Sequence, residues 1–172
     1  MNLECEVCVI RSWREGDEES LVHQANNRKI WLNLRDRFPH PYTLADAKWW
    51  VQHAKDQKPE TDFTIEVDGR AAGGISLILH DDIERCSAEI GYWLGESYWG
   101  RGIMTAALKS VTEFAFQEFN LTRVYALPFS RNVSSSNVLE KVGYVLEGVL
   151  RRSATKDGEI IDQLMYAKTN SI

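Results

Sequence analysis

The chain has 172 residues, of which 44% are hydrophobic and 26% are charged, so it is long enough to bury the core of one compact domain. Its formal net charge of -5 argues against nucleic acid as the main partner, because phosphate backbones bind to dense basic surfaces. No apolar run is long enough to span a bilayer. The residues that follow Met1 also lack the pattern of a signal peptide, in which an apolar segment follows a basic one. We therefore expect a cytoplasmic protein without a membrane partner.

The three cysteines predict neither a disulfide framework nor a metal site. Their number is odd, and a chain of this length needs no covalent cross-links. Cys5 and Cys8 form a C-x-x-C motif, but no second pair or nearby histidine completes a set of zinc ligands. We favour a packing role over zinc or redox chemistry for this pair.

The first third of the chain predicts one strand followed by helices. Residues 4–13 alternate between apolar and polar side chains, and apolar residues recur at helical spacing in two places within 16–34. Two prolines then impose an extended loop over 35–42. Thr43 and Asp46 have the spacing of a capping box, which predicts the start of a further helix.

The middle of the chain predicts three strands and a helix. Residues 61–67 and 71–79 read as a hairpin that turns at Asp68-Gly69. Residues 85–95 form a further alternating strand, and a wide apolar stripe predicts a helix over 104–115.

The last third predicts a strand over 122–129, a helix over 132–142 that Gly143 stops, and a hairpin that turns at 156–158. This order of elements predicts an α/β (α+β) fold with a mixed, mostly antiparallel, seven-stranded sheet and helices on both faces. We find no repeat and no linker, so we expect a single domain over 1–172.

The start of the fourth helix has the composition of an anion site. Gly100, Arg101 and Gly102 precede it, and no acidic residue occurs from Ser97 to Thr112. Glycines let backbone N–H groups surround an oxygen-rich ligand, and a helix N-terminus supplies partial positive charge. The alternative is a tight turn that only needs small residues. The patterns of a mononucleotide P-loop and of a dinucleotide fingerprint are both absent.

At this point the sequence resembles a known family. "AEIGYWLGESYWGRGIMTAAL" (88–108) and "NVSSSNVLEKVGYVLEG" (132–148) resemble the central block of the GNAT acyl-CoA N-acyltransferases, in the branch of the ribosomal-protein alanine N-acetyltransferases. "NLRDRFPHPYTLADAKWW" (33–50) resembles the substrate-side segment of related members. The resemblance spans nearly the whole chain. It implies the GNAT fold, in which a central pair of strands is splayed apart.

The resemblance also implies where acetyl-CoA binds. The family loop [QR]-x-x-G-x-[GA] holds the pyrophosphate through backbone amides, and here it matches with Trp99, Gly102 and Met104. Trp99 matters little if only its amide is used, whereas Met104 either narrows the path of the pyrophosphate or points into the core. The cofactor residues expected from this match, with no metal, are Trp93, Leu94, Trp99, Gly100, Arg101, Gly102, Ile103, Met104, Thr105, Asn132 and Asn137.

Acetyl transfer to an amine also needs an acid for the departing thiolate and a base for the amine. Ser135 is our candidate acid: it lies on the inward stripe of its helix, and the ribosomal-protein branch places a serine in the N-x-x-S motif. Packing is the alternative role for this hydroxyl. Many members carry a tyrosine acid at the position of Leu139, and the branch places a glutamate base at that of Ala154. Glu89 is therefore our candidate base, against the alternative of a surface carboxylate.

The acceptor side carries many aromatic residues, whose open roles are core, dimer contact and pocket wall. Trp31, Arg35, His40 and Tyr42 are the substrate residues that we expect. We expect Asp162 and Tyr166 to be structural, and Cys86 not to act as a nucleophile.

The sequence thus predicts an acetyl-CoA-dependent N-acetyltransferase that acts by direct transfer in a ternary complex, and a protein or peptide N-terminal α-amine is the favoured acceptor. One alternative is acetylation of a small amine or polyamine. The other is a noncatalytic acyl-CoA-binding regulatory module. The expected partners are acetyl-CoA and the amine, and a homodimer is left open.

Overall fold

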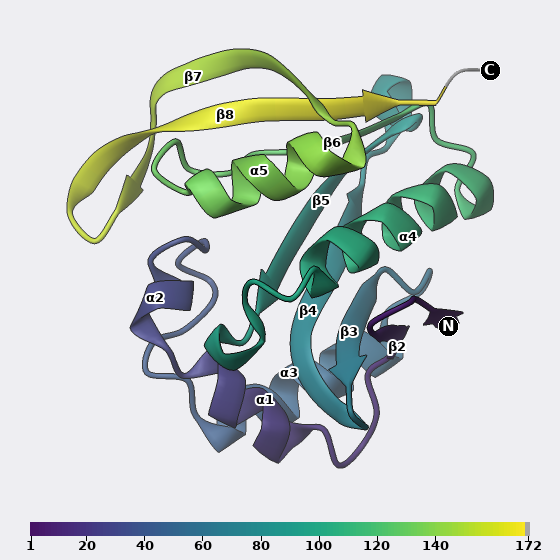
Figure 1. Cartoon of the computed structure of the whole chain (residues 1–172), viewed down its shortest axis with the longest axis vertical. Coiled ribbons are helices and arrows are strands. Elements are labelled where there is room, and N and C mark those ends of the chain that lie inside the picture. The colour runs from purple at the N-terminus through teal and green to yellow at the C-terminus, as the bar shows by residue number, and fades with distance from the viewer. Residues whose placement is uncertain (171–172) are drawn as a thin grey trace. The chain divides into compact units, whose positions relative to one another are not determined.

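The computed structural model describes residues 1–170 of the chain. Figure 1 shows their helices and strands, which follow the order β1 (Asn2–Glu4), β2 (Val9–Ser12), α1 (Glu18–Ala25), α2 (Arg28–Trp31), α3 (Leu44–Asp56), β3 (Asp62–Val67), β4 (Arg70–Leu79), η1 (Asp82–Glu84), β5 (Ser87–Leu94), η2 (Glu96–Tyr98), α4 (Ile103–Glu118), β6 (Arg123–Ala126), α5 (Val133–Val142), β7 (Val145–Lys156) and β8 (Glu159–Thr169).

The chain forms two compact units. The first comprises Met1–Ser76 and Tyr92–Ala107, and the second comprises Leu77–Gly91 and the chain from Leu108 onward. Strands β4 and β5 and helix α4 each contribute residues to both units. The expectation of one domain over 1–172 stays a prediction.

The strands follow the order β1-β2-β3-β4-β5-β6-β8-β7. Strands β5 and β6 run parallel, whereas the pairs β1–β2, β2–β3, β3–β4, β6–β8 and β7–β8 are antiparallel. The α/β class with a mixed, mostly antiparallel sheet is therefore confirmed. The described residues contain eight strands rather than the predicted seven.

The eighth strand is β1, which lies almost entirely before the predicted strand over 4–13. That predicted range covers Glu4, a turn and all of β2. Cys5 donates its N–H to the carbonyl of Cys8 at 2.9 Å, which closes a tight turn between β1 and β2. The C-x-x-C spacing is thus that of a hairpin loop, and its alternation was misread as continuous strand. Burial is the largest cause that raises the pKa of the Cys8 thiol to about 12, so this thiol is protonated near neutral pH.

Other local signals in the sequence give the expected structure. Thr43 and Asp46 form the capping box of α3, with the Asp46 carboxylate accepting from the Thr43 N–H at 2.7 Å. Asp68 and Gly69 both adopt positive φ, at 49° and 76°, as the predicted β3–β4 turn requires. Gly143 ends α5 with a φ of 90°. These features depend only on neighbouring residues.

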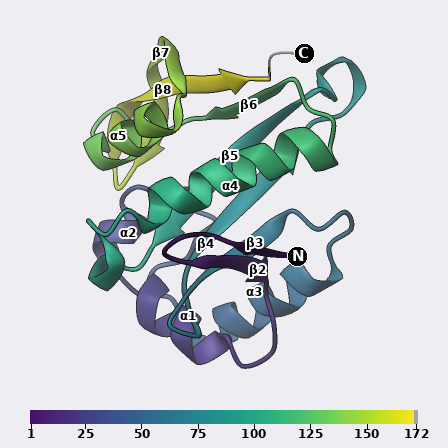
Figure 2. The same cartoon turned by 45° about the vertical axis from the view of Figure 1, so that its right-hand side comes forward.

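Helices α1 and α3 form the core of the first unit with β2–β4, and both cartoon views show them beside these strands (Figures 1 and 2). Their apolar faces meet in one buried cluster, against which Val22, Phe38, Trp50 and Trp93 pack. The buried members are Trp13, Leu21, Ala25, Tyr42, Ala47, Val51, Ala54 and Ala71.

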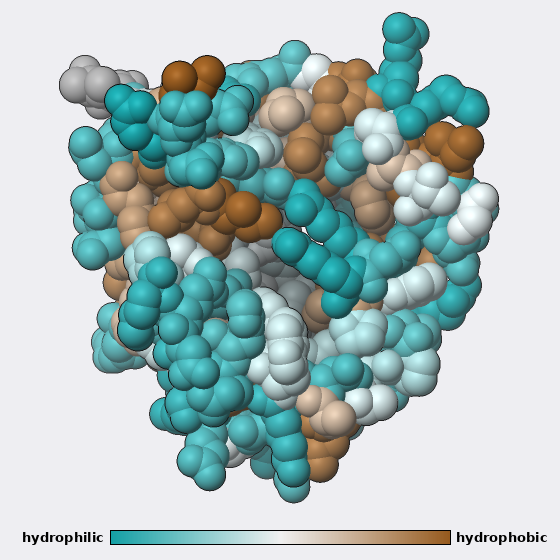
Figure 3. All heavy atoms as spheres, turned by 180° about the vertical axis from the view of Figure 1, so that it is seen from behind, coloured by the Kyte–Doolittle hydropathy of each residue, from teal (hydrophilic) through white to brown (hydrophobic). Residues whose placement is uncertain are grey.

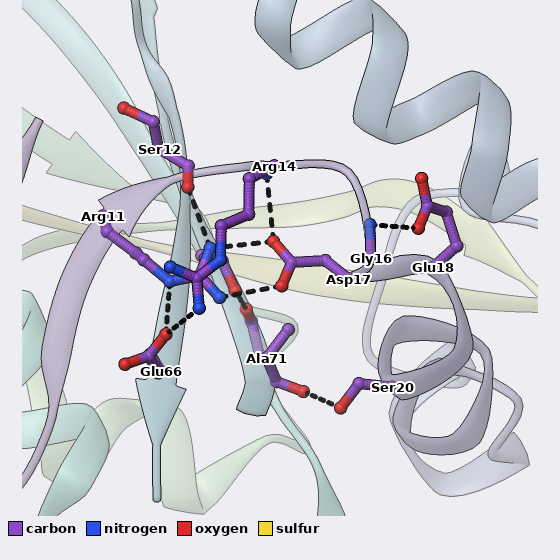
Figure 4. Close-up of polar contacts among 11 residues, drawn as sticks. Arg11, Ser12, Arg14, Gly16, Asp17, Glu18, Ser20, Glu66 and Ala71 are labelled. Atoms are coloured by element: carbon purple, nitrogen blue, oxygen red, sulfur yellow. Dashed lines mark hydrogen bonds and ion pairs between the residues drawn. The ribbon is translucent and has the colours of Figure 1, made fainter. Parts of the chain in front are cut away.

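A buried ion pair fixes where α1 begins. The Arg11 guanidinium donates two hydrogen bonds to Asp17, at 2.7 and 2.8 Å, and a third to Glu66 of β3 (Figure 4). Asp17 precedes α1 but does not cap it with its side chain, because its carboxylate accepts from Arg11 and from the Arg14 N–H. These bonds join β2, β3 and the start of α1. Since charges this deep are costly to leave unpaired, they specify one arrangement of the three elements.

In the second unit, α5 is held against β8. Tyr166 donates to Glu140 at 2.8 Å, and Lys168 donates to the carbonyl of Val142 at 2.8 Å. Strands β7 and β8 carry several exposed apolar side chains: Val145, Leu146, Val149, Leu150 and Ile160. Figure 3 shows one face of the molecule as largely hydrophilic, with apolar surface in separate patches. A homodimer stays an open prediction.

Two glycines of β4 allow a very close approach of β5, whose backbone lies against Gly73 and whose Trp93 side chain lies against Gly74. A Cβ on Gly73 would lie 2.4 Å from the carbonyl oxygen of Trp93 and 3.0 Å from the Cα of Leu94. A Cβ on Gly74 would lie 2.8 Å from the Trp93 indole nitrogen. Since backbone atoms cannot move aside as a flexible side chain can, Gly73 is required here for space.

We predict that Gly73→Ala lowers the free energy of unfolding by about 1–3 kcal/mol or more, the usual cost of forcing atoms into a packed site. Urea denaturation measures it. The matched control is Gly91→Ala in β5, where an added Cβ meets no described atom within 4 Å. An equal loss in both variants would contradict the steric explanation.

Candidate functional site

The end of β5 delivers the chain to the predicted anion loop, and its path is fixed by β4. Gly95 donates its N–H to the carbonyl of Ala72 at 2.8 Å. A Cβ on Gly95 would lie 2.1 Å from the Gln24 Oε1 and 3.1 Å from the Ala72 oxygen. Gly95 is therefore enclosed by β4 and α1, and the loop leaves the sheet at a defined point.

The loop itself is anchored by an aromatic side chain. Trp99 donates its indole N–H to the carbonyl of Leu94 at 2.8 Å, while its ring stays 47% exposed. The Arg101 guanidinium lies over the Tyr98 ring, 5.5 Å from its centroid. Trp99 thus closes the loop through its side chain.

Gly100 and Gly102 adopt positive φ, at 74° and 76°, which L side chains rarely adopt. Apart from each glycine and its two neighbours in the chain, no described atom lies within 4 Å of where a Cβ would stand on either residue. These glycines are therefore needed for backbone conformation, in contrast to Gly73, and their surroundings leave room for a ligand.

Helix α4 begins directly after this loop with no acidic residue in its first turn. Ala106 donates to the Gly102 carbonyl at 3.1 Å, which closes the first turn. The N–H groups of Ile103, Met104 and Thr105 come before the first possible intrahelical donor, so they project from the helix end with its partial positive charge. The structure therefore brings the loop residues 99–105 together at a helix N-terminus that suits a pyrophosphate.

The predicted acceptor residues belong to the same unit but differ in burial. Trp31 stacks on His40 with ring centroids 5.5 Å apart, and Arg28 lies over the Trp31 ring at 5.4 Å. Tyr42 is instead buried in the core of the unit, where burial raises its pKa above the usual range. Arg35 is exposed.

Trp93 faces the aromatic side of the unit. Its indole nitrogen lies over Gly74, and its ring meets Phe38 edge-on, with centroids 5.6 Å apart. Leu94 is buried. The cofactor role expected for Trp93 and Leu94 stays a prediction.

The candidate base lies in the second unit, where β5 and β6 separate. Their parallel pairing comprises only three residues and ends at Glu89 opposite Tyr125, although β5 continues to Leu94. This early end of the pairing is the expected splay of the central strands. Glu89 is half-buried at that point. The Tyr125 hydroxyl in turn bonds to the His80 Nε2 at 2.8 Å, and their rings stack.

Ser135 and Asn132 lie together at the start of α5. The Asn132 side chain caps the helix by accepting from the Ser135 N–H at 3.2 Å. Ser135 is half-buried in the first turn, where the helix field stabilises nearby negative charge. Leu139 is fully buried, as a packing residue is, and Asn137 is exposed.

Two further contacts in the described part of the chain have no signal in the sequence. One is the His80–Tyr125 pair, and the other joins Glu96 to Asn27 and Lys29, 69 and 67 residues away in the chain. Among the described residues, no group of three or more His, Cys, Asp or Glu side chains is placed to hold a metal ion. No described helix is both long and apolar enough to cross a membrane.

Comparison with known proteins identifies the family of this fold and loop. Residues 8–145 match the family model described as the acetyltransferase (GNAT) domain. The chain belongs to the GNAT acetyltransferases. Family membership makes it an acetyl-CoA-dependent N-acyltransferase, as the sequence predicted.

Some relatives have names that state an acceptor, and others do not. The probable N-acetyltransferase YjcK of Bacillus subtilis (strain 168) is 35% identical over 161 residues, which cover 89% of this chain and 88% of that protein. The spermidine N(1)-acetyltransferase of Escherichia coli (strain K12) is 26% identical over 145 residues, covering 84% and 77%.

A solved structure of RimL, a ribosomal L7/L12 alpha-N-protein acetyltransferase in complex with coenzyme A, has a TM-score of 0.87 over 98% of both chains. At 22% identity, this likeness shows a shared fold.

Proposed function

We propose that this GNAT acetyltransferase transfers the acetyl group of acetyl-CoA to the N-terminal α-amine of a protein or peptide. The transfer is direct, from acetyl-CoA to the amine in a ternary complex. The observation that supports acetyl-CoA binding is the α4 N-terminus, where two glycines at positive φ precede a first helical turn without acidic residues.

The pyrophosphate of acetyl-CoA would accept hydrogen bonds from the backbone N–H groups of residues 100–105. This arrangement explains why the loop tolerates Trp99 at a position where the family often has Gln or Arg, since the Trp99 side chain is committed to Leu94. Met104 is half-buried, and its amide remains available whichever way its side chain points. The chemistry of these donors fits a phosphate group.

Side chains of this protein would then take a proton from the acceptor amine and give a proton to the departing thiolate. The acceptor nitrogen must be neutral to attack the thioester carbonyl, so its ammonium proton goes to a base, for which we propose Glu89. The C–S bond breaks as the C–N bond forms, and the thiolate takes a proton, which we propose comes from Ser135. The excess proton of the newly acetylated nitrogen then restores the Ser135 hydroxyl. A hydroxyl in the first turn of α5 suits this role, because the same helix field stabilises the developing thiolate.

The free energy needed to deprotonate the acceptor favours an α-amine over a lysine or polyamine. A lysine amine with a pKa of about 10.4 needs roughly 4 kcal/mol to be neutral near pH 7.5, whereas an α-amine near 7.8 needs well under about 1 kcal/mol. Ala154, at the position where the ribosomal-protein branch has its glutamate base, cannot take a proton. The amine that costs least free energy to deprotonate is therefore the better substrate.

A polyamine is the second candidate acceptor, because the spermidine acetyltransferase of E. coli matches most of this chain. Its primary amines carry the same deprotonation cost as lysine. Acetylation of spermidine would therefore require a stronger base than Glu89, or a pocket that desolvates the ammonium group.

We predict that Gly102→Asp abolishes the thermal shift caused by CoA, since it places a carboxylate beside the pyrophosphate and like charges held this close cost several kcal/mol. Gly102→Asn is the matched control. Asparagine and aspartate have nearly the same size and both occur at positive φ, so the two variants differ mainly in charge. Equal shifts in both folded variants would remove the pyrophosphate from this loop.

We predict that Ser135→Ala lowers kcat by about 10²-fold, the usual cost of losing one proton donor, with little change in the Kd of acetyl-CoA. The helix cap should survive, because Asn132 accepts from the Ser135 backbone. Ser134→Ala, at an exposed position one residue earlier, serves as the control. A Ser135→Ala enzyme with near-wild-type kcat would assign this serine to packing.

For the acceptor, we predict a higher kcat/KM for a peptide that offers only a free N-terminus than for a matched peptide that offers only a lysine. Both peptides and spermidine are assayed from pH 6 to 9. The preference should narrow as the pH rises, because lysine then loses its proton more readily. A preference for lysine or spermidine across this range would refute the α-amine proposal.

A further inference from the structure

An acidic side chain next to the loop proposed to bind CoA is bonded to the acceptor side of the same unit. Glu96, in the short turn η2, accepts a hydrogen bond from Asn27 Nδ2 at 2.7 Å. The Lys29 ammonium donates to the other Glu96 oxygen. Only Ser97 and Tyr98 separate Glu96 from Trp99, the first residue of that loop.

Asn27 uses both ends of its amide. Its Oδ1 caps α2 by accepting from the Lys29 N–H at 2.8 Å, while its Nδ2 donates to Glu96. Helix α2 comprises only four residues, Arg28–Trp31, and so short a helix is not stable by itself in water. Its position therefore depends on its cap, on the buried Ile30 and on Glu96.

Helix α2 matters for function because it carries Trp31, whose ring stacks on His40. Both residues are among the proposed acceptor contacts. Glu96 thus connects the loop after β5 to the helix that presents this aromatic pair, through side chains that lie in one compact unit.

We propose that Glu96 is a positioning residue that transmits the binding of acetyl-CoA at the loop to α2, so that Trp31 and His40 are ordered for the acceptor. The inference rests on the proposed function for the location of CoA. It makes the two substrates bind cooperatively, with the acceptor held more tightly by the enzyme that already holds acetyl-CoA.

The charges of the three residues support this role. The hydrogen bond from Lys29 is the largest cause that lowers the pKa of Glu96, followed by that from Asn27, so Glu96 is ionised near neutral pH. Its charge is partly offset by the Lys29 ammonium. Coupling between two binding sites typically changes an affinity by about 5–150-fold, which a linkage of this kind has to supply.

The discriminating variant is Asn27→Asp. Aspartate caps helices as well as asparagine does, so α2 keeps its N-cap. The amide donor is lost, however, and a carboxylate then faces Glu96 across a contact that is 2.7 Å in the native protein. The reciprocal double variant Asn27→Asp/Glu96→Gln restores a hydrogen bond, donated now from position 96, and leaves Lys29 a carboxylate partner.

Hydrogen exchange of the backbone amides of residues 28–34 provides the test, with and without saturating acetyl-CoA. In the wild-type protein we expect acetyl-CoA to slow this exchange at least about threefold. In Asn27→Asp the slowing should disappear, although a thermal shift still shows that acetyl-CoA binds, and in the double variant it should return. Persistence of the slowing in Asn27→Asp would overturn the proposal.

Steady-state kinetics with the preferred acceptor gives the second readout. We expect Asn27→Asp to raise the acceptor KM about tenfold, with kcat and the Kd of acetyl-CoA within about twofold, and the double variant to recover. Glu113→Gln, which removes one exposed carboxylate of α4, is the control. A rise in KM together with falls in kcat and Tm would mean a merely structural role. Wild-type protein that binds no acetyl-CoA would overturn the proposed function and this inference together, whereas binding without slower exchange would overturn only the inference.

Discussion

The backbone contact between Gly73 and Trp93 is the constraint on which the first unit depends. Strand β5 passes so close to β4 that a single added carbon would meet a carbonyl oxygen at 2.4 Å. This contact fixes where Leu94 and Gly95 lie, and they in turn set the start of the loop through the Trp99–Leu94 and Gly95–Ala72 hydrogen bonds. A ligand site made of backbone amides needs this rigidity, because amides bind an anion well only when they are already oriented.

The glycines of this region serve different physical purposes. Gly73 is required because backbone atoms occupy the space of a side chain, and at Gly95 that space holds the end of the Gln24 side chain. Gly100 and Gly102 are instead required because of their backbone angles and have open surroundings. Gly73 lets β5 pack closely against β4, and Gly100 and Gly102 turn the chain into α4. A single rule about flexible glycines would miss this division, since none of the four needs to move.

Sequence reasoning succeeded where structure depends on neighbouring residues. The Thr43–Asp46 capping box, the Asp68-Gly69 turn and the Gly143 helix end all follow from local chemistry. It failed at Cys5-x-x-Cys8, because a two-residue turn between alternating segments does not interrupt the apolar pattern. Sequence reasoning could not predict the hydrogen bond from Asn27 to Glu96, since polar surface residues so far apart in the chain carry no periodic signal. For the candidate site, sequence located the loop but gave no means of telling which aromatic residues are buried, as Tyr42 is.

The cap made by Asn132 changes how the N-x-x-S motif is to be interpreted in related chains. The asparagine closes the first turn of α5 through the backbone of residue 135, so it is useful to the fold whatever side chain that residue carries. Evolution could therefore discard the hydroxyl and keep the asparagine without unravelling the helix. Paralogues with an intact cap and an altered fourth position would then be folded proteins with lost or changed chemistry, and the two halves of the motif should be scored separately when function is transferred among them.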